Sequence, residues 1–364
     1  MIEIIKIILV FPLFLFFIYV PFPILEKHDE ENRLSFLAFN LIINCNILLF
    51  LSLLPISIKE YQNMFIILYF LIFAYTTFIY KINLTTKNYT DLFVFFLSFF
   101  ILACVIANDL NLGWDAKFIY YIKSLFFYEG LNLNNLSNFE HNKWHPHLGS
   151  YLWAFFWKIS LFDIEYFGRL FYLFIFTFSI YFVCIKSAKY KYFNYVLYFL
   201  ILIIFFRYDR FSGLQEILIF SFLIISSKFL YNLSIKNKFS NIFNILLLAN
   251  LMMWIKSEGI VYSTIIIIIL LFNKNLQYKE KIYKFLNFII LFFLKVLIFK
   301  YYNFEVNAQP YNLEYIQSIS LNEFFYRIYL ITIYLGYYSL KNIIFIFGIL
   351  LLIILNFTSK NKIS

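Results

Sequence analysis

Long apolar runs alternate with short polar connections from one end of the chain to the other. Runs of about 18 or more apolar residues are long enough to cross the hydrocarbon core of a bilayer. In lipid, backbone N–H and C=O groups must be hydrogen-bonded within the protein, which favours helices for these runs. The strands of a membrane barrel would alternate apolar and polar residues with a period of two, whereas these runs are continuously apolar. The pattern predicts an all-α fold, a polytopic integral membrane helical bundle with about 11–13 hydrophobic segments.

The longest polar interval divides these segments into two groups. The candidates before it cover residues 4–25, 36–57, 63–80 and 91–107. The candidates after it cover residues 148–162, 167–185, 193–206, 214–231, 241–255, 259–272, 285–301, 324–340 and 342–357. We therefore expect one transmembrane domain over residues 1–364, made of N-terminal spans (1–107), an interfacial catalytic loop (108–150) and the remaining helical bundle (151–364).

The first apolar run follows Lys6 and contains Pro12, Pro21 and Pro23. It is long for a cleaved signal peptide, and the flank from Glu26 to Arg33 is strongly charged, so a retained first span is favoured over a signal sequence.

Composition agrees with a membrane protein and excludes other classes. The chain is 63% hydrophobic and only 14% charged, against roughly 45–50% apolar residues in soluble domains. Its net charge of +10 is spread over short loops, which is typical of membrane topology and not of a nucleic-acid-binding surface. The cysteines Cys45, Cys104 and Cys184 lie far apart inside apolar runs and give no disulfide or metal spacing.

Three basic clusters predict the orientation of the later segments. They are Lys186, Lys189 and Lys191; Lys228, Lys236 and Lys238; and Lys274, Lys279, Lys281 and Lys284. The positive-inside bias places all three in the cytoplasm, and Arg207–Gly213 and Lys256–Gly259 on the opposite face. The acidic loop 302–323, with Glu305, Glu314 and Glu323, also fits the outside.

One question of parity stays open. If segments 148–162 and 167–185 both cross fully, the polar interval falls on the cytoplasmic side with the first cluster. The first of these segments is short for a span, so a tilted or partial crossing is the alternative.

The candidate catalytic acid is Asp115, in Gly113-Trp114-Asp115-Ala116-Lys117. A helix over 114–129 would be amphipathic and suited to the membrane interface, with Gly130 as its stop. Its apolar face would carry Trp114, Phe118, Tyr121, Ile122 and Leu125, and its polar face Lys117, Tyr120, Lys123 and Ser124. Asp115 would lie in the first turn, where the helix dipole stabilises a carboxylate. The alternative is that Asp115 only caps this helix.

Two further polar groups follow apolar segments. Lys256 and Glu258 lie in Trp254-Ile255-Lys256-Ser257-Glu258-Gly259, where a helix break would let the lysine meet a phosphate; a plain hairpin turn is the alternative. Arg207 and Arg210, followed by Gly213, Gln215 and Glu216, suit a lipid phosphate because guanidinium binds oxyanions bidentately; an ordinary solvated loop is the alternative.

His141, His145 and His147 lie close together, next to Glu140 and around Pro146. Their spacing matches no zinc signature, so we expect no metal ligands and favour substrate contact or interface polarity for His145 and His147.

These motifs, in this order, resemble bacterial GT-C glycosyltransferases, multi-spanning enzymes that use polyprenyl-phosphate-linked sugars. The matching residues are Trp114-Asp115-Ala116, His145-Pro146, Gly213-Leu214-Gln215-Glu216 and Lys256-Ser257-Glu258-Gly259, within residues 108–272. The chain departs from the family where His147-Leu148-Gly149 follows His-Pro in place of an aromatic-Pro pair.

The resemblance implies sugar transfer at the external face of a bacterial inner membrane, from a polyprenyl-phosphate donor to a lipid, glycan or protein acceptor. Asp115 would be the catalytic carboxylate, and Lys256 with Arg207 or Arg210 would hold the phosphate, with Glu258, Glu216, Lys117, His145 and His147 as further binding candidates. Some relatives use a divalent cation and others do not, so the cofactor is open. The rival functions are a multi-spanning transporter or lipid flippase, and a non-catalytic membrane assembly protein.

Overall fold

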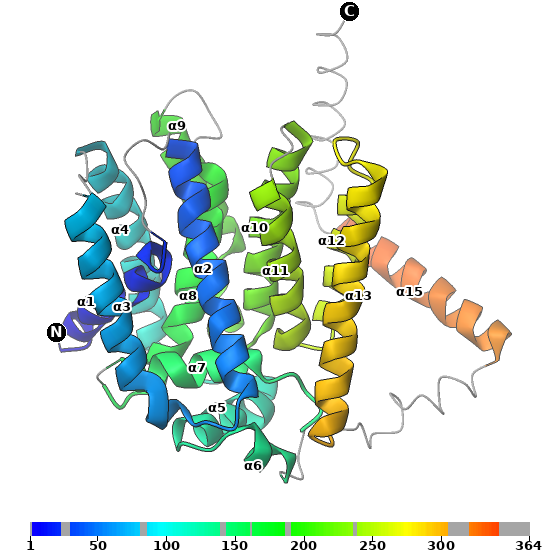
Figure 1. The fold of residues 1–364 in the computed structure, drawn as a ribbon, viewed down its shortest axis with the longest axis horizontal. Helices are drawn as coiled ribbons and strands as arrows, with labels where there is room; N and C mark the ends of the chain where they lie inside the picture. Colours follow the sequence, from blue (N-terminus) through cyan, green and yellow to red (C-terminus); the bar gives the residue numbers. More distant parts are fainter. Residues whose placement is uncertain are drawn as a thin grey trace, which may run out of the picture. The chain divides into compact units, whose positions relative to one another are not determined.

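The computed structural model describes residues 2–22, 30–80, 86–138, 143–160, 162–185, 191–235, 239–304 and 320–341. Over these ranges the regular structure is helical, with fourteen α-helices, one short π-helix and one 3₁₀ turn (Figure 1). The predicted all-α fold is therefore confirmed. The candidate span 342–357 and His141 lie outside the described residues.

The chain divides into two compact units, Met1–Glu305 and Val306–Ser364. One domain over the whole chain stays a prediction. In the second unit the described helix is α15 (Leu321–Lys341). The helices of the first unit are α1 (Ile2–Tyr19), α2 (Glu30–Leu53), α3 (Ile58–Tyr80), α4 (Thr86–Asn108), α5 (Tyr121–Tyr128), α6 (Leu133–Ser137), α7 (Leu148–Ile159), α8 (Tyr166–Cys184), α9 (Lys191–Phe205), α10 (Glu216–Ile235), α11 (Phe239–Ile255), α12 (Gly259–Leu271) and α13 (Tyr278–Tyr301).

Six described helices are long and apolar enough to cross a membrane, so the chain is a multi-pass membrane protein. Their apolar portions are Arg33–Leu53, Ile58–Phe78, Thr90–Asn108, Tyr166–Cys184, Glu216–Ile235 and Tyr278–Tyr301. Helix α8 is the centre of the first unit, because 94% of its span is buried, whereas α13 has 17% of its span buried. Large apolar side chains on α13, including Ile290, Phe293 and Leu297, are more than half exposed, as expected for a lipid-facing helix.

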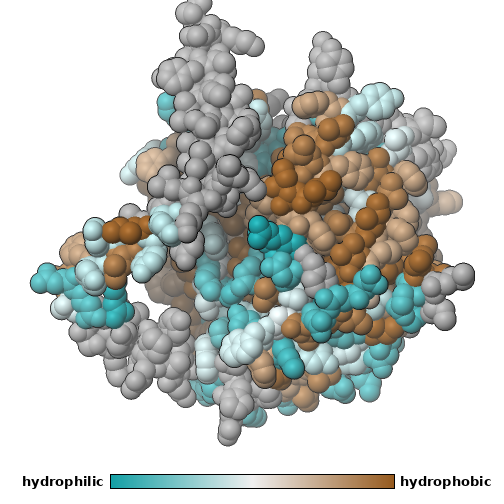
Figure 2. All heavy atoms as spheres, turned by 180° about the vertical axis from the view of Figure 1, so that it is seen from behind, coloured by the Kyte–Doolittle hydropathy of each residue, from teal (hydrophilic) through white to brown (hydrophobic). Residues whose placement is uncertain are grey.

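On the face of the molecule seen in Figure 2, apolar and polar side chains gather in different areas. Figure 2 shows a broad area of brown, hydrophobic side chains on one face, with teal, hydrophilic side chains gathered beside it. This separation is what a bilayer requires, since charged groups are costly in the hydrocarbon core and stable in the adjoining interface.

Helix α7 answers the question of parity. It has twelve residues, which is about 18 Å of helix and too short to cross a core of roughly 30 Å. It runs beside α5 from end to end: the Ser150 hydroxyl donates to the Tyr120 carbonyl (3.0 Å), and the Trp157 and Tyr128 rings stack with centroids 4.0 Å apart. Segment 148–162 is thus a buried helix at one end of the bundle, and not a transmembrane crossing.

Several chain segments meet at this end of the first unit, with α5, α6 and α7 (bottom of Figure 1). Four connections lie at this end: the one after α4, the one before α8, the one between α9 and α10, and the one between α11 and α12. Hydrogen bonds join them to one another. The described lysines of the three basic clusters are in α9, α10 and the α12–α13 region, toward the other ends of these helices. The positive-inside bias therefore predicts that the end with α7 faces outward.

The predicted amphipathic helix forms, and its polar side faces the protein. Residues 114–128 are helical, with a π-type stretch at Ala116–Tyr120 leading into α5. Trp114 is 73% exposed and Phe118 is 49% exposed, whereas Lys123 is 1% exposed. Gly130, at φ +95°, ends the helix as predicted. An outward apolar stripe on a segment outside the spans is suited to the membrane interface.

Candidate functional site

Residues Ser212–Glu216 connect the motifs that are distant in the sequence. The Ser212 carbonyl accepts a hydrogen bond from the Gly113 N–H at 2.9 Å, which joins this segment to the loop before Asp115. Gly213 follows at φ +94°, and a Cβ there would lie 2.8 Å from the Ala116 Cβ and 2.6 Å from a Trp153 ring carbon. A glycine is required at this position both for its backbone conformation and for the close approach of its neighbours.

Gln215 extends the connection to α7 and α11. With its amide oriented so that both ends are satisfied, the nitrogen donates to the Ile255 carbonyl at 2.6 Å and the oxygen accepts from the Ser150 N–H at 3.0 Å. Gly149 leaves room for this side chain, because a Cβ there would lie 2.3 Å from the Gln215 Cδ. Gln215 is fully buried, so its hydrogen bonds fix the relative positions of three segments.

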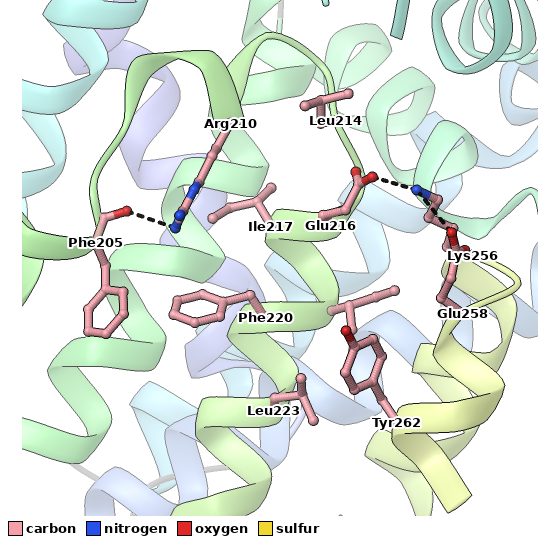
Figure 3. Close-up of a pocket in the computed structure, with 11 residues that line it drawn as sticks. Phe205, Arg210, Leu214, Glu216, Ile217, Phe220, Leu223, Lys256, Glu258 and Tyr262 are labelled. Carbon is pink, nitrogen blue, oxygen red and sulfur yellow. Dashed lines mark hydrogen bonds and ion pairs between the residues drawn. The ribbon is translucent and has the colours of Figure 1, made fainter. Parts of the chain in front are cut away.

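Lys256 completes the set of contacts (Figure 3). Its ammonium group binds the carboxylate of Glu216 and lies 3.4 Å from that of Glu258. Burial disfavours the charged form, but the hydrogen bond to Glu216 and the surrounding negative charge outweigh burial and raise the pKa of Lys256 above its usual 10.5. Lys256 opens the tight turn between α11 and α12, where the Gly259 N–H donates to its carbonyl at 3.0 Å, and its side chain is a charged group held between two carboxylates.

A cavity of about 570 Å³ opens beside these charges. Its polar end is formed by Arg210, Glu216, Lys256 and Glu258. Its remaining wall is apolar apart from the Tyr262 hydroxyl, and is lined by Phe205, Leu214, Ile217, Ile219, Phe220, Leu223 and Tyr262. Figure 3 shows the charged side chains at one end and Phe220, Leu223 and Tyr262 farther along α10 and α12. The cavity thus has the amphiphilic character of a lipid with a charged headgroup.

Arg210 differs from Lys256 in its partners. Its guanidinium donates to the Phe205 carbonyl at 3.3 Å, and within the described ranges no carboxylate pairs with it. Among the described residues that line the cavity it is thus the cation whose charge is not matched by a bound carboxylate. Its positive charge would therefore attract an anion that enters the cavity.

Asp115 lies near this cluster but does not line the cavity. It is half-buried, has helical backbone angles and makes no capping hydrogen bond with its side chain, so the capping alternative is not supported. Burial raises the pKa of Tyr120, with Lys256 opposing and the negative charges of Glu216, Glu258 and Asp115 adding to the rise. Asp115 and Lys256 therefore act on the same tyrosine and belong to one electrostatic environment.

The two described histidines occupy different surroundings. His147 is 1% exposed and its Nε2 lies 2.8 Å from the Ser52 hydroxyl; burial, reinforced by Lys123 and Lys295, lowers its pKa to about 3. His145 is half-buried; burial and Lys123 lower its pKa to about 4, with Glu258 and Asp115 opposing. His145 is thus the nearer of the two to the charged cluster, and His147 packs in the interior.

Arg207 and Lys117 are exposed and do not line the cavity. Lys117 lies 5.8 Å from the centre of the Phe118 ring, on the outward side of the interfacial helix. The structure therefore brings together Arg210, Glu216, Lys256 and Glu258, places Asp115 and His145 within electrostatic range, and leaves Arg207, Lys117 and His147 apart.

Sequence reasoning did not identify the buried cations, among them Lys123 and Arg169. Lys123 donates to the His145 carbonyl at 2.6 Å, and burial lowers its pKa to about 7. Arg169 is fully buried and binds the carboxylate of Glu165. The available signal was a charged residue within or beside an apolar segment, which is rare unless it has a partner or a function.

The described residues do not fit a divalent cation. No group of three or more His, Cys, Asp or Glu side chains within the described ranges could hold a metal ion. The two carboxylates at the cavity, Glu216 and Glu258, are already occupied by the ammonium group of Lys256.

Comparison with protein-family models, with curated proteins and with solved structures finds no match to this chain.

Proposed function

We propose that this protein is a membrane glycosyltransferase of the GT-C type, which moves a sugar from a polyprenyl-phosphate donor to a lipid, glycan or protein acceptor at the external face. The observation that carries the proposal is the convergence of Gly113–Ala116, His147–Ser150, Ser212–Glu216 and Ile255–Glu258 at one end of the bundle. Three of these segments carry the motifs at Trp114–Ala116, Gly213–Glu216 and Lys256–Glu258 on which the family resemblance rests, and the fourth directly follows His145-Pro146.

The cavity supports a lipid phosphate as the donor. Its charged end can meet a phosphate through Arg210 and Lys256, and its apolar wall can pack against a prenyl chain. From Glu216 to Leu223 the wall follows α10 for about 10 Å, given a rise of about 1.5 Å per residue. A lipid would therefore bind with its headgroup at the membrane interface and its chain directed toward the hydrocarbon core.

Asp115 is the residue that we assign to the acceptor. In the reaction the acceptor hydroxyl oxygen attacks the anomeric carbon of the sugar, and the bond from that carbon to the phosphate oxygen breaks. The electron pair of that bond stays on the phosphate oxygen, and the hydroxyl proton passes to the carboxylate of Asp115. Arg210 and Lys256 balance the charge that develops on the leaving phosphate.

The position of the cavity favours a transferase over a transporter. Transporters bind their substrate near the bilayer midplane between repeated halves. Here the charged residues lie at helix ends, namely at the start of α10 and in the α11–α12 connection. Such a site is suited to chemistry on a headgroup at one surface of the membrane.

The proposal is tested with the purified full chain in lipid nanodiscs. Polyprenyl-phosphate-linked hexoses and pentoses are supplied as donors, with a membrane glycolipid extract as the acceptor source, and the release of polyprenyl phosphate is measured. We expect turnover with at least one donor, and a decrease in kcat of about 10²-fold or more in Asp115→Asn, because a positioned general base contributes about that factor.

The matched control is Asp109→Asn, an exposed acid in the same loop whose Oδ1 accepts from the Asn111 N–H, a bond that an amide oxygen can also accept. It should keep the activity of the unmodified protein. Absence of turnover with every donor, or equal turnover in the Asp115→Asn variant, would contradict the proposal.

A further inference from the structure

Arg169 connects the two loops that carry the candidate reaction groups. Its side chain is fully buried near the start of α8. The Nε and one terminal nitrogen donate to the two oxygens of Glu165, at 2.9 and 3.0 Å, in a bidentate pair. This pair fixes the plane of the guanidinium group, since both ends of the fork are bound.

The remaining donors of Arg169 reach backbone carbonyls on both loops. One terminal nitrogen donates to the Phe211 carbonyl at 3.3 Å, and the other donates to the Leu110 carbonyl at 3.4 Å. Phe211 follows Arg210 directly, and Leu110 precedes Asp115 by five residues. A single rigid group therefore spans from the acid-bearing loop to the phosphate-binding loop.

Two other contacts support the same alignment. Gly113 and Ser212 are joined by their backbone hydrogen bond, on the side toward Asp115 and Glu216. The Trp153 indole N–H donates to the Glu165 carbonyl at 3.4 Å, while its ring meets Gly213. The Glu165–Arg169 pair thus holds residues 211–213 in place, through the Arg169 contact with Phe211 and through Trp153, which contacts both Glu165 and Gly213.

We propose that Arg169 is a positioning residue: it sets the separation between Asp115 and the Arg210–Glu216 loop through the carbonyls of Leu110 and Phe211. The inference rests on the proposed transferase function for its catalytic consequence. A merely charge-neutralising Arg169–Glu165 pair would need only the Glu165 contacts. The two carbonyl contacts require a planar group with several donors, which lysine cannot replace.

The test uses Arg169→Lys, which keeps the charge and can still pair with Glu165. The matched control is Arg327→Lys, because Arg327 forms the same type of i,i+4 pair with Glu323 on an exposed helix. Transfer kinetics should show kcat lowered about 10²-fold in Arg169→Lys with a much smaller change in KM for the donor, since a misplacement of about 1 Å can cost that factor. The control should leave both constants unchanged.

A second measurement does not depend on activity. A Cβ at position 113 would lie 2.8 Å from the Ser212 hydroxyl oxygen, so cysteines introduced by Gly113→Cys and Ser212→Cys are within disulfide reach. In a background lacking Cys45, Cys104 and Cys184, disulfide formation is followed by mass spectrometry. We expect the rate to fall about tenfold when Arg169→Lys is added, in line with a coupling of neighbouring contacts.

The outcomes separate the two proposals. An unchanged disulfide rate, or a lowered rate with an unchanged kcat, overturns the positioning role of Arg169. A lowered rate together with a lowered kcat supports it. If the unmodified protein transfers no sugar, the proposed function fails, and the disulfide rate alone decides whether Arg169 aligns the loops.

Discussion

Lys256 binds Glu216 across 40 positions of sequence, and this contact joins the α11–α12 connection to the start of α10. Because Glu258 lies at 3.4 Å from the same ammonium group, the three residues together carry a formal charge of −1, and Arg210 brings the polar end of the cavity to neutrality. Lys256 therefore has two effects on an arriving anion: it supplies positive charge, and it screens two carboxylates that would otherwise repel the anion.

Replacement of Lys256 by alanine should weaken the binding of a lipid phosphate. The variant exposes the cavity to the unpaired charges of Glu216 and Glu258, and we expect Kd to rise about tenfold or more, since about 1.4 kcal/mol corresponds to each factor of ten. Binding of polyprenyl phosphate to protein in nanodiscs measures the change. Adding Glu216→Gln to Lys256→Ala should recover part of the lost affinity.

The control for this prediction is Lys274→Ala, an exposed lysine between α12 and α13. It should bind polyprenyl phosphate like the unmodified protein. Equal affinity in the Lys256→Ala and Lys274→Ala variants would remove Lys256 from the phosphate site.

Gly213 and Gly130 allow packing to be separated from backbone strain. Both have φ near +95°, but a Cβ at 213 would lie 2.6 Å from Trp153, whereas a Cβ at 130 would have its nearest neighbour at 3.8 Å. We expect Gly130→Ala to cost about 1 kcal/mol and Gly213→Ala to cost about 1–3 kcal/mol more, from overpacking. Thermal unfolding of the two variants in detergent compares them. A Gly213→Ala protein no less stable than Gly130→Ala would contradict the close approach of the two loops.

His147 should make the protein sensitive to acid. Burial lowers its pKa to about 3 in the folded state, below the usual 6.5. Between these values the unfolded chain binds a proton that the folded chain does not, so stability falls as the pH drops from about 6.5. The contribution is about 1.4 kcal/mol per pH unit for one proton. Denaturant unfolding between pH 7 and 4.5 should show a shallower loss in His147→Gln, and identical curves for the two proteins would refute this origin.

The orientation in the membrane can be tested with single cysteines in a background lacking the native ones. Asn134 in α6 lies at the end with α7, and Lys274 lies at the opposite ends of α12 and α13; both are exposed. A membrane-impermeant thiol reagent added to intact cells should label Asn134→Cys and not Lys274→Cys. The reverse pattern would place the candidate site in the cytoplasm.

The hydrophobic pattern predicted the helices well, because apolar length alone decides what can lie in a bilayer. Residues 167–185 and 259–272, for example, were predicted as segments and are α8 and α12. The amphipathic pattern of 114–129 predicted an interfacial helix. It did not predict that the side chains of Tyr120 and Lys123, on the polar side of this helix, are buried against the protein. That depends on which side of the helix α7 covers, a contact between segments that periodicity does not encode.

The candidate site was predicted in part for a similar reason. Lys256 and Glu258 were identified because charges near apolar segments are costly. The two residues are close together in the sequence, and nothing there indicates that the more distant Glu216 is the closer partner of Lys256. His147 was grouped with His145 by sequence proximity, although His147 is the N-cap residue of α7 and the structure places the two side chains in different surroundings. The role of Arg169 was missed because, apart from Glu165, its acceptors are backbone carbonyls, which every residue carries.

The burial of α7 has a consequence for biosynthesis. This helix is too short to be retained in the bilayer as an independent span. It packs against α2, α3 and α5, which are synthesised before it, and against α8 and α11, which are synthesised after it. Gln215 and Ile255 are the last residues needed to fix its position. The ribosome must therefore have completed about two-thirds of the chain before α7 can reach its final environment, so truncated nascent chains ending before residue 255 should leave it accessible to proteases.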